Sequence, residues 1–263
     1  MTAGVPSPGE LRGWVRTQRD GAVLAVTLDR PDQLNAQTPE TWAALADIGR
    51  DLDPAVRVVV VRGAGRAFSA GLDRSLFDPS PGIRGGLGEL GRLSADEAQE
   101  RIRGYQAGFR WLRSAGIVSV AAVQGHAIGA GAQLALACDL RVLADDAALR
   151  LPEATLGLVP DLTGTGTLVE AVGYSRALEI CLTGRAVGAA EARAIGLATA
   201  VVPPADLEAA VGDLVQALLA PPVAASRATA ALVRSAVRND AETQDAAERA
   251  AQVRRLHDLV GGA

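Results

Sequence analysis

The order of apolar and polar residues along the chain predicts alternating strands and helices. Apolar positions alternate or run through residues 15–18 and 22–28, on either side of Asp20-Gly21, which is typical of a β-hairpin. Short, largely apolar runs, typical of strands buried on both faces, occupy residues 56–61, 118–123 and 140–143. Such buried strands, with helices between them, indicate an α/β fold with parallel strands.

Helix signals lie between these strands and dominate the last third of the chain. Thr38 can cap a helix whose first turn holds Pro39, and Ser94 with Glu97 forms a capping box for a helix that runs to about residue 114. A short apolar helix is expected to end near Cys138. Further helices are predicted over residues 168–172, 175–182, 188–195, 207–219, 223–237 and 241–257. Two segments rich in Gly, Pro and Ser, residues 1–12 and 74–93, predict a flexible tail and a mobile surface loop.

Composition narrows the class of protein. The chain has 263 residues, 49% of them apolar and 21% charged, so it can bury a large core. Its net charge of −4 argues against a general nucleic-acid binder. All 26 basic residues are arginine, which excludes lysine nucleophiles and Schiff bases.

The cysteines and histidines limit the chemistry further. The two cysteines, Cys138 and Cys181, are too few for a disulfide framework. The two histidines, His126 and His257, are too few for a His-rich metal site, and no Cys/His pair has the usual ligand spacing. No signal peptide is apparent, and polar residues interrupt the longest apolar stretch, residues 117–140. We therefore expect a soluble cytoplasmic protein that binds no metal, nucleic acid or membrane.

Three glycine-rich segments follow predicted strands and can carry chemistry. They read R-G-A-G-R-A-F-S-A-G-L-D at 62–73, G-H-A-I-G-A-G-A-Q at 125–133 and P-E-A-T-L-G-L-V-P-D-L-T-G at 152–164. A dinucleotide fingerprint needs a third glycine where Phe68 and Leu134 stand. A serine hydrolase would use Ser69, in A-x-S-x-G, with the distant His257.

A third interpretation uses main-chain groups. Two turns that glycine permits, each just after a buried strand, can point free N–H groups into one cleft. The second turn, Gly129-Ala130-Gly131, also opens a helix, whose dipole favours negative charge there. Two converging N–H groups form an oxyanion hole. The alternative, simple tight packing between strand and helix, stays open on spacing alone.

Five ordered motifs resemble those of the crotonase superfamily, the enoyl-CoA hydratases and isomerases. The resemblance covers about residues 13–260. The motifs are D-R-P-D-Q-L-N-A at 29–36, A-F-S-A-G-L-D at 67–73, Q-G-H-A-I-G-A-G-A-Q-L-A at 124–135, C-D-L-R at 138–141 and L-P-E-A-T-L-G-L-V-P at 151–160.

The resemblance implies a fold and an assembly. The fold would be a crotonase-like ββα spiral core over residues 13–200, followed by a C-terminal helical region, residues 201–263, used for trimerisation. The trimers of this family often pair into hexamers. Substrates would be acyl-CoA or enoyl-CoA thioesters, so coenzyme A belongs to the substrate and no separate cofactor is expected.

The resemblance also implies site residues. The N–H groups of Leu72 and Ala130 would form the oxyanion hole. Positions implied to contact the CoA thioester are Gln33, Leu34, Ala36, Ala70, Leu72, Asp73, Gly129, Ala130 and Pro152. Arg62 and Arg66 are further candidates for the phosphates, although the sequence favours exposed solubilising arginines at both positions.

The carboxylates depart from the usual hydratase pattern. Hydratases of this family hold a water between two glutamates, and Glu153 matches the second of them. Gln133 stands at the first, where an amide can orient water but cannot act as a general base. Asp161 follows Glu153 by eight residues, where some dienoyl-CoA isomerases of this family carry an aspartate.

The predicted catalytic set is thus Glu153 as the main acid/base, with Asp161 and Gln133. This set is compatible with hydration of an enoyl-CoA. Double-bond isomerisation suits it better, because only one of the two hydratase glutamates is retained. Asp161 can instead be a helix-capping or loop aspartate near Thr163 and Gly164, and Gln133 can serve helix packing alone. A non-catalytic acyl-CoA binder is the alternative that the substitution at Gln133 suggests.

Overall fold

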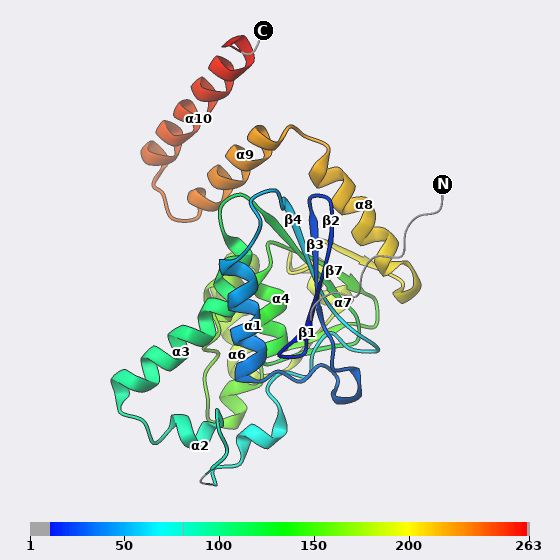
Figure 1. Cartoon of the computed structure of the whole chain (residues 1–263), viewed down its shortest axis with the longest axis vertical. Coiled ribbons are helices and arrows are strands. Elements are labelled where there is room, and N and C mark those ends of the chain that lie inside the picture. The colour runs from blue at the N-terminus through cyan, green and yellow to red at the C-terminus, as the bar shows by residue number, and fades with distance from the viewer. Residues whose placement is uncertain (1–10, 81, 262–263) are drawn as a thin grey trace.

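A computed structural model describes residues 11–80 and 82–261 and confirms the mixed α/β fold. Its main sheet has seven strands in the order β1-β2-β3-β4-β5-β7-β10, and a smaller sheet has the order β6-β8-β9 (Figure 1). The strands are β1 Leu11–Arg12, β2 Val15–Asp20, β3 Val23–Leu28, β4 Val58–Gly63, β5 Val118–Val123, β6 His126–Ile128, β7 Leu140–Ala144, β8 Ala148–Arg150, β9 Ala186–Gly188 and β10 Ala200–Val202.

The main sheet joins the predicted hairpin to the predicted parallel strands. β2 and β3 pair in antiparallel register with Asp20 opposite Val23, as the Asp20-Gly21 turn predicts. The pairs β3-β4, β4-β5, β5-β7 and β7-β10 are all parallel. The side chains of the central strand β4 are buried on both faces, which explains its unbroken run of valines.

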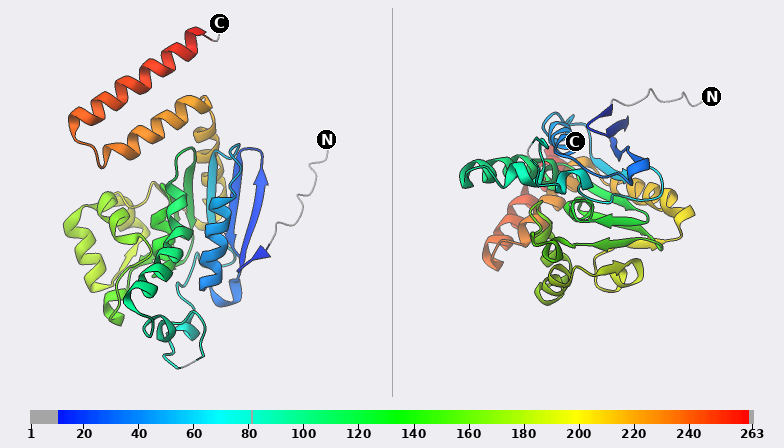
Figure 2. Two further views of the ribbon diagram at one scale, coloured as in Figure 1. Left: turned by 60° about the vertical axis from the view of Figure 1, so that its left-hand side comes forward. Right: turned by 90° about the horizontal axis from the view of Figure 1, so that it is seen from below.

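Helices cover both faces of this sheet (Figure 2). The α-helices are α1 Pro39–Arg50, α2 Leu87–Leu90, α3 Ala95–Arg110, α4 Ala130–Ala137, α5 Gly164–Val172, α6 Tyr174–Thr183, α7 Ala189–Ala194, α8 Leu207–Leu219, α9 Val223–Ala236 and α10 Ala241–Gly261. Short 3-10 turns are η1 Pro31–Gln33, η2 Arg74–Phe77, η3 Trp111–Arg113, η4 Glu153–Leu156 and η5 Pro204–Asp206. The predicted caps at Thr38 and Ser94 are present, each as a capping box.

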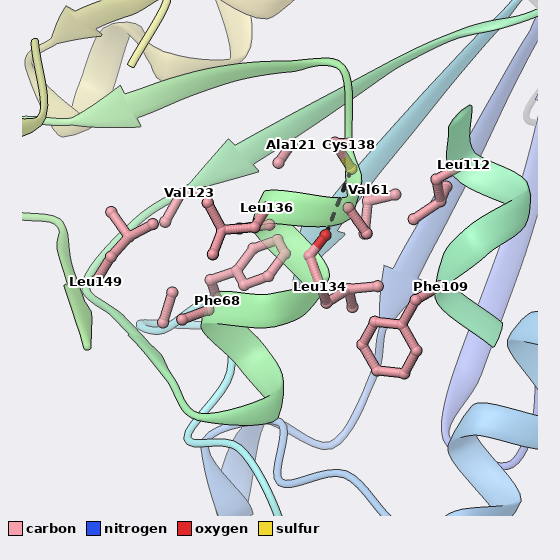
Figure 3. Packing of buried hydrophobic residues seen from close by; sticks show 14 of the residues in the cluster. Val61, Phe68, Phe109, Leu112, Ala121, Val123, Leu134, Leu136, Cys138 and Leu149 are labelled. Atoms are coloured by element: carbon pink, nitrogen blue, oxygen red, sulfur yellow. Dashed lines mark hydrogen bonds between the residues drawn. The ribbon is translucent and has the colours of Figure 1, made fainter. Parts of the chain in front are cut away.

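The larger core lies between the sheet, α1, α3 and α4. Figure 3 shows Phe68, Phe109 and Leu134 packed together there, with Cys138 donating to the carbonyl of Leu134. Burial raises the pKa of the Cys138 thiol to about 12, so this cysteine is an inert core residue. On the opposite face, α8 packs Leu207, Val211 and Val215 against β4, β5 and β7.

Several elements differ from the sequence predictions. Leu11 and Arg12, assigned to the flexible tail, form β1, while residues 1–10 lie outside the described residues. β6, β8, β9 and β10 were not predicted, because three-residue strands are too short to show a periodicity. The segment 74–93, predicted as a loop, contains η2 and α2. The predicted boundary between residues 200 and 201 falls inside β10, and the division into regions stays a prediction.

The last two helices, α9 and α10, extend away from the sheets (Figures 1 and 2). They pack against each other, and of their residues only Ala251 is buried. Within the described ranges, no single helix is long and apolar enough to cross a membrane. The segments 204–219 and 223–236 meet that test only as a pair, and the pair is bent by 104°.

Candidate active site

The site is built on three loop segments that lie side by side. The segment 67–73 runs between residues 34–37 and residues 124–128. On one side, the amide of Ala70 donates to the carbonyl of Leu34 at 2.8 Å. On the other, Ser69 forms a parallel bridge with the His126–Ile128 strand. The first, second and third resemblance motifs therefore meet in one place, as expected if they share a function.

Glycines let the first and second turns approach each other. Gly71 has a φ of +87°, and a Cβ placed there would lie 2.4 Å from the carbonyl oxygen of Ile128. A Cβ on Gly131 would lie 2.6 Å from the carbonyl oxygen of Ser69. No larger residue fits either position without moving the backbone, so the sequence demands glycine there.

The same geometry brings the two predicted amides together. The Cβ position of Gly71 is 3.4 Å from the nitrogen of Ala130, which is the first residue of α4. Gly71 accepts from the amide of Gln37 at 2.7 Å, and Asp73 donates to the carbonyl of Gln37 at 2.9 Å. In an extended segment, the N–H of the residue between them faces the other way, so the amide of Leu72 points away from Gln37. Within the described residues, 11–80 and 82–261, neither the N–H of Leu72 nor the N–H of Ala130 has a hydrogen-bond acceptor.

Gln133 and Glu153 form a buried pair next to these turns. Gln133 is 1% exposed and Glu153 8% exposed. The carbonyl oxygen of the Gln133 side chain accepts from the amides of Leu162 and Gly164, at 2.8 and 3.3 Å. Its NH₂ group must then face Glu153, and it donates to Glu153 Oε1 at 2.9 Å. This amide is thus held on three sides by the protein.

The second oxygen of Glu153 is buried and has no hydrogen-bond partner among the described residues. Burial, with the nearby charge of Asp161, raises the pKa of Glu153 above its usual range. Burial also raises the pKa of Asp161. Two carboxyl groups of raised pKa, near enough for the charge of one to act on the other, form an arrangement that proton transfer can use.

Two glutamine side chains hold the loop that carries Asp161 through its main chain. Gln133 binds it through Leu162 and Gly164, and Gln106 from α3 donates to the carbonyl of Asp161 at 2.7 Å. Thr163, not Asp161, is the N-cap of α5, and no side chain caps this helix. The capping role of Asp161 is therefore wrong, while the alternative of a loop aspartate without a catalytic role stays open.

The positions implied for CoA contact fall into three groups. Gln33 is exposed at the end of η1, and Leu34, Ala36, Ala70, Leu72, Gly129 and Pro152 are half-buried. Ala130 is buried, but its amide starts α4. Asp73 is also buried: it pairs with Arg30 and accepts from Ser75, which hold the pKa of its carboxyl below the usual range despite burial. The Asp73 side chain is committed to the protein itself.

The hydrolase alternative lacks its nucleophile. Ser69 is completely buried, and its hydroxyl donates to the carbonyl of Asn35 at 2.8 Å. His257 is an exposed residue of α10, the helix that extends away from the sheets. Within the described chain, no group of three or more His, Cys, Asp or Glu residues is placed to hold a metal ion.

Three polar residues of the site were missed by the sequence analysis. The side chain of Asn35 donates to the carbonyls of Ala64 and Ala67. Its φ of +57° is one that asparagine tolerates. An asparagine within a loop motif was therefore a usable signal. Gln37 and Gln106 gave no such signal, because single glutamines beside or within a helix are common on surfaces.

A separate groove of about 590 Å³ lies between α1 and α3. Pro39, Leu93 and Tyr105 contribute to its lining. None of the predicted site residues lines it.

Comparison with known proteins places the chain in a family. The sequence profile of the enoyl-CoA hydratase/isomerase family matches residues 18–259. The chain belongs to the enoyl-CoA hydratase/isomerase family. The crotonase resemblance of the five motifs is thereby confirmed.

Relatives within this family include both named activities. A peroxisomal Δ(3,5)-Δ(2,4)-dienoyl-CoA isomerase of Arabidopsis thaliana is 30% identical over 189 residues, covering 71% of this chain and 68% of the relative. A Thermobifida fusca YX protein described as an enoyl-CoA hydratase is 50% identical, with a TM-score of 0.89 and 95% of each chain covered, in a crystal structure with CoA. A second structure of it, with acetoacetyl-CoA, gives a TM-score of 0.88 at 50% identity over 94% of this chain and 96% of the other.

Proposed function

We propose that this family member is an enoyl-CoA isomerase, in which Glu153 and Asp161 move a proton between carbons of a CoA thioester. The observation that carries the proposal is the engagement of Gln133 by Leu162, Gly164 and Glu153. An amide held in this way cannot take a proton from water. The two-carboxylate hydration mechanism would therefore lack one of its partners, whereas isomerisation would use Glu153 and Asp161, both of which the chain carries.

The main-chain amides of Leu72 and Ala130 would stabilise the intermediate. Both are unpaired within the described residues and lie near each other. Removal of a proton beside the thioester carbonyl moves an electron pair onto its oxygen, and two N–H donors at that oxygen lower the barrier. The positive end of the α4 dipole acts in the same direction.

Proton transfer would then proceed in two steps. The Glu153 carboxylate takes the C2 proton of a 3-enoyl-CoA, the C2–H electron pair enters the conjugated system, and the thioester oxygen becomes negative. Asp161 in its protonated form returns a proton at C4, and the double bond moves to C2–C3. Exchange with solvent restores the starting protonation states.

CoA binding is supported by the 50% identical Thermobifida fusca protein, whose structures contain CoA and acetoacetyl-CoA. In this chain the CoA moiety would lie along Gln33, Leu34 and Ala36 and past Ala70, toward Gly129 and Pro152. The amide of Ala70 donates to the carbonyl of Leu34, which places these two positions side by side. Asp73, although at an implied contact position, would support this surface from beneath through its pair with Arg30.

The region 201–263 would assemble the chain into a homotrimer or a dimer of trimers. The support is the set of exposed apolar side chains on α9, on α10 and at the residue that follows α9, which contact with another copy of the chain would cover. They are Val223, Val233, Val237, Val253, Leu256, Leu259 and Val260. Light scattering coupled to size-exclusion chromatography measures this state directly.

The test compares hydration of a short 2-enoyl-CoA with double-bond migration of the matching 3-enoyl-CoA. We expect migration to dominate, Glu153→Gln to lower its kcat by about 10²–10⁴ and Asp161→Asn by about 10². Both variants keep the shape and the hydrogen-bonding oxygen of the side chain. Dominant hydration would reject the isomerase assignment in favour of a Gln133-held water. Tight acyl-CoA binding without turnover would show a non-catalytic binder.

A further inference from the structure

A fully buried polar network lies directly behind the first turn. The side chains of Ser69 and Gln37 both have 0% exposure. Ser69 Oγ accepts from Gln37 Nε2 at 3.0 Å and from the amide of Gly71 at 3.2 Å, and donates to the carbonyl of Asn35 at 2.8 Å. Gln37 Oε1 accepts from Trp42 Nε1 of α1 at 2.8 Å. The network is satisfied throughout, and such networks hold one geometry firmly.

This network lies where the main chain of residues 69–73 stops bonding to the second turn and starts bonding to Gln37. Through its main chain, Ser69 bridges to the second turn, since its amide donates to His126 and its carbonyl accepts from Ile128. Two residues later the chain is bound instead by the main chain of Gln37, through Gly71 and Asp73. The Ser69 hydroxyl connects both sides, because it binds the Gly71 amide and the Gln37 side chain together.

The direction of the Leu72 amide depends on the peptide units on either side of it. The unit before Gly71 is held by Ser69 Oγ, and the carbonyl of Gly71 is held by the Gln37 amide. The carbonyl of Gly71 and the N–H of Leu72 belong to one peptide plane, so fixing the first fixes the second. Gly71, with its left-handed φ, would otherwise leave this plane free to rotate.

We propose that Ser69 and Gln37 are positioning residues that hold the Leu72 amide at the angle required by the thioester oxyanion. The inference rests on the proposed function, because it gives a purpose to the same pair of amides. Ser69 has no access to substrate, so its effect passes through the main chain. Preorganised donors lose much of their value when their direction becomes variable.

The experiment uses Ser69→Ala in the full-length protein, with Ser119→Ala as the matched control. Ser119 is also a serine of 0% exposure, and its hydroxyl donates to the carbonyl of Leu112 at 2.6 Å, but it lies on β5 among core residues. We expect Ser69→Ala to lower kcat by about tenfold to a hundredfold, less than the loss of a whole donor. The Kd for free CoA, which has no acyl carbonyl, should change less than about twofold.

A spectroscopic readout separates positioning from stability. The infrared stretch of a ¹³C-labelled thioester carbonyl in bound 2-enoyl-CoA reports hydrogen bonds to that oxygen. Ser69→Ala should move this band toward its position in free substrate, and Ser119→Ala should leave it unchanged. If Ser69→Ala does not fold, Gln37→Leu removes the same link from the other end and should produce the same shift.

The outcomes distinguish the two levels of the proposal. A wild-type protein whose bound carbonyl band matches that of free substrate would reject the amide site itself, and with it the proposed function. A shifted wild-type band that stays the same in Ser69→Ala and Gln37→Leu, with kcat no lower than in Ser119→Ala, would overturn only the positioning role.

Discussion

The two sides of the candidate site are built by different means. The amide side consists of main-chain groups in two turns, each held by bridge hydrogen bonds to its neighbours. The carboxylate side consists of the side chains of Gln133, Glu153 and Asp161, held by one amide and one loop. The amide side requires glycines and tight packing, while the carboxylate side requires particular functional groups.

In the proposed function, the amide side would stabilise the intermediate, whereas the carboxylate side would select the reaction. Two N–H groups serve any reaction that places negative charge on a thioester oxygen. The fate of the proton depends on which carboxyl groups lie near C2 and C4, and on whether a water is activated. Variants on the amide side should therefore affect hydration and isomerisation alike, whereas variants that add or remove a carboxyl group on the carboxylate side should change their ratio.

The largest effect in this comparison is expected from Gly71→Ala. A methyl group there meets the carbonyl oxygen of Ile128 and opposes the φ of +87°, so the turn must move. We expect kcat/KM to fall about 10²–10³ for every substrate that is turned over. Steady-state kinetics measures the fall, and circular dichroism checks the fold.

Gly212→Ala is the matched control for this variant. Gly212 is an exposed residue of α8 with open space at its Cβ position, so activity should be unchanged. A Gly71→Ala enzyme with unaltered kcat/KM would show that the turns do not supply the donors.

An intermediate effect is expected from Gln133→Glu, which tests the carboxylate side. A carboxylate can still accept from Leu162 and Gly164, and its second oxygen would take the place of Nε2, 2.9 Å from Glu153 Oε1. Two carboxyl groups at that separation share a proton, and one of them can then activate water. We expect the ratio of hydration to isomerisation to rise about tenfold or more.

Gln133→Leu is the companion variant, because it removes the anchor of the Asp161 loop without adding a carboxyl group. Both activities should fall together in it. If Gln133→Glu leaves the ratio of hydration to isomerisation as it is, Gln133 does not decide the reaction.

The smallest effect is a change in stability with pH. Burial raises the pKa of Glu153 in the folded protein above that of the unfolded chain, so the folded form holds its proton to higher pH. The free energy of unfolding therefore falls as pH rises through the window between the two pKa values. Above that window, Glu153→Gln should raise Tm by a few °C, on the order of 1 kcal/mol, and below it the two Tm values should coincide.

Thermal melts at pH 4 and pH 8 check this, with Asp213→Asn as the control. Asp213 is exposed on α8, so its neutralisation should leave the difference between the two pH values unchanged. A Glu153→Gln protein that is less stable than wild type at pH 8 would contradict a raised pKa for this group.

Prediction from the sequence was strongest where a pattern repeats over many residues. The runs at β4 and β5, and the caps at Thr38 and Ser94, define their elements locally. It was weakest for three-residue strands such as β6 and β9, which exist only because a neighbouring strand supplies their hydrogen bonds. The region 74–93 shows the same limit, since its short helical turns depend on contacts outside them.

For the site, the sequence by itself determined the two glycine turns, the positions of Glu153 and Asp161, and the substitution at Gln133. The turns follow from residue identity, because only glycine permits them, whereas the carboxyl positions and the substitution at Gln133 follow from the resemblance of the motifs to the family. Only the tertiary structure decided that Gln133 is bound on three sides, that Asp161 is not a helix cap, and that Ser69 supports a turn from within the core. Each of these depends on hydrogen bonds to partners between two and 34 residues away along the chain. No local sequence pattern predicts that those partners come close together.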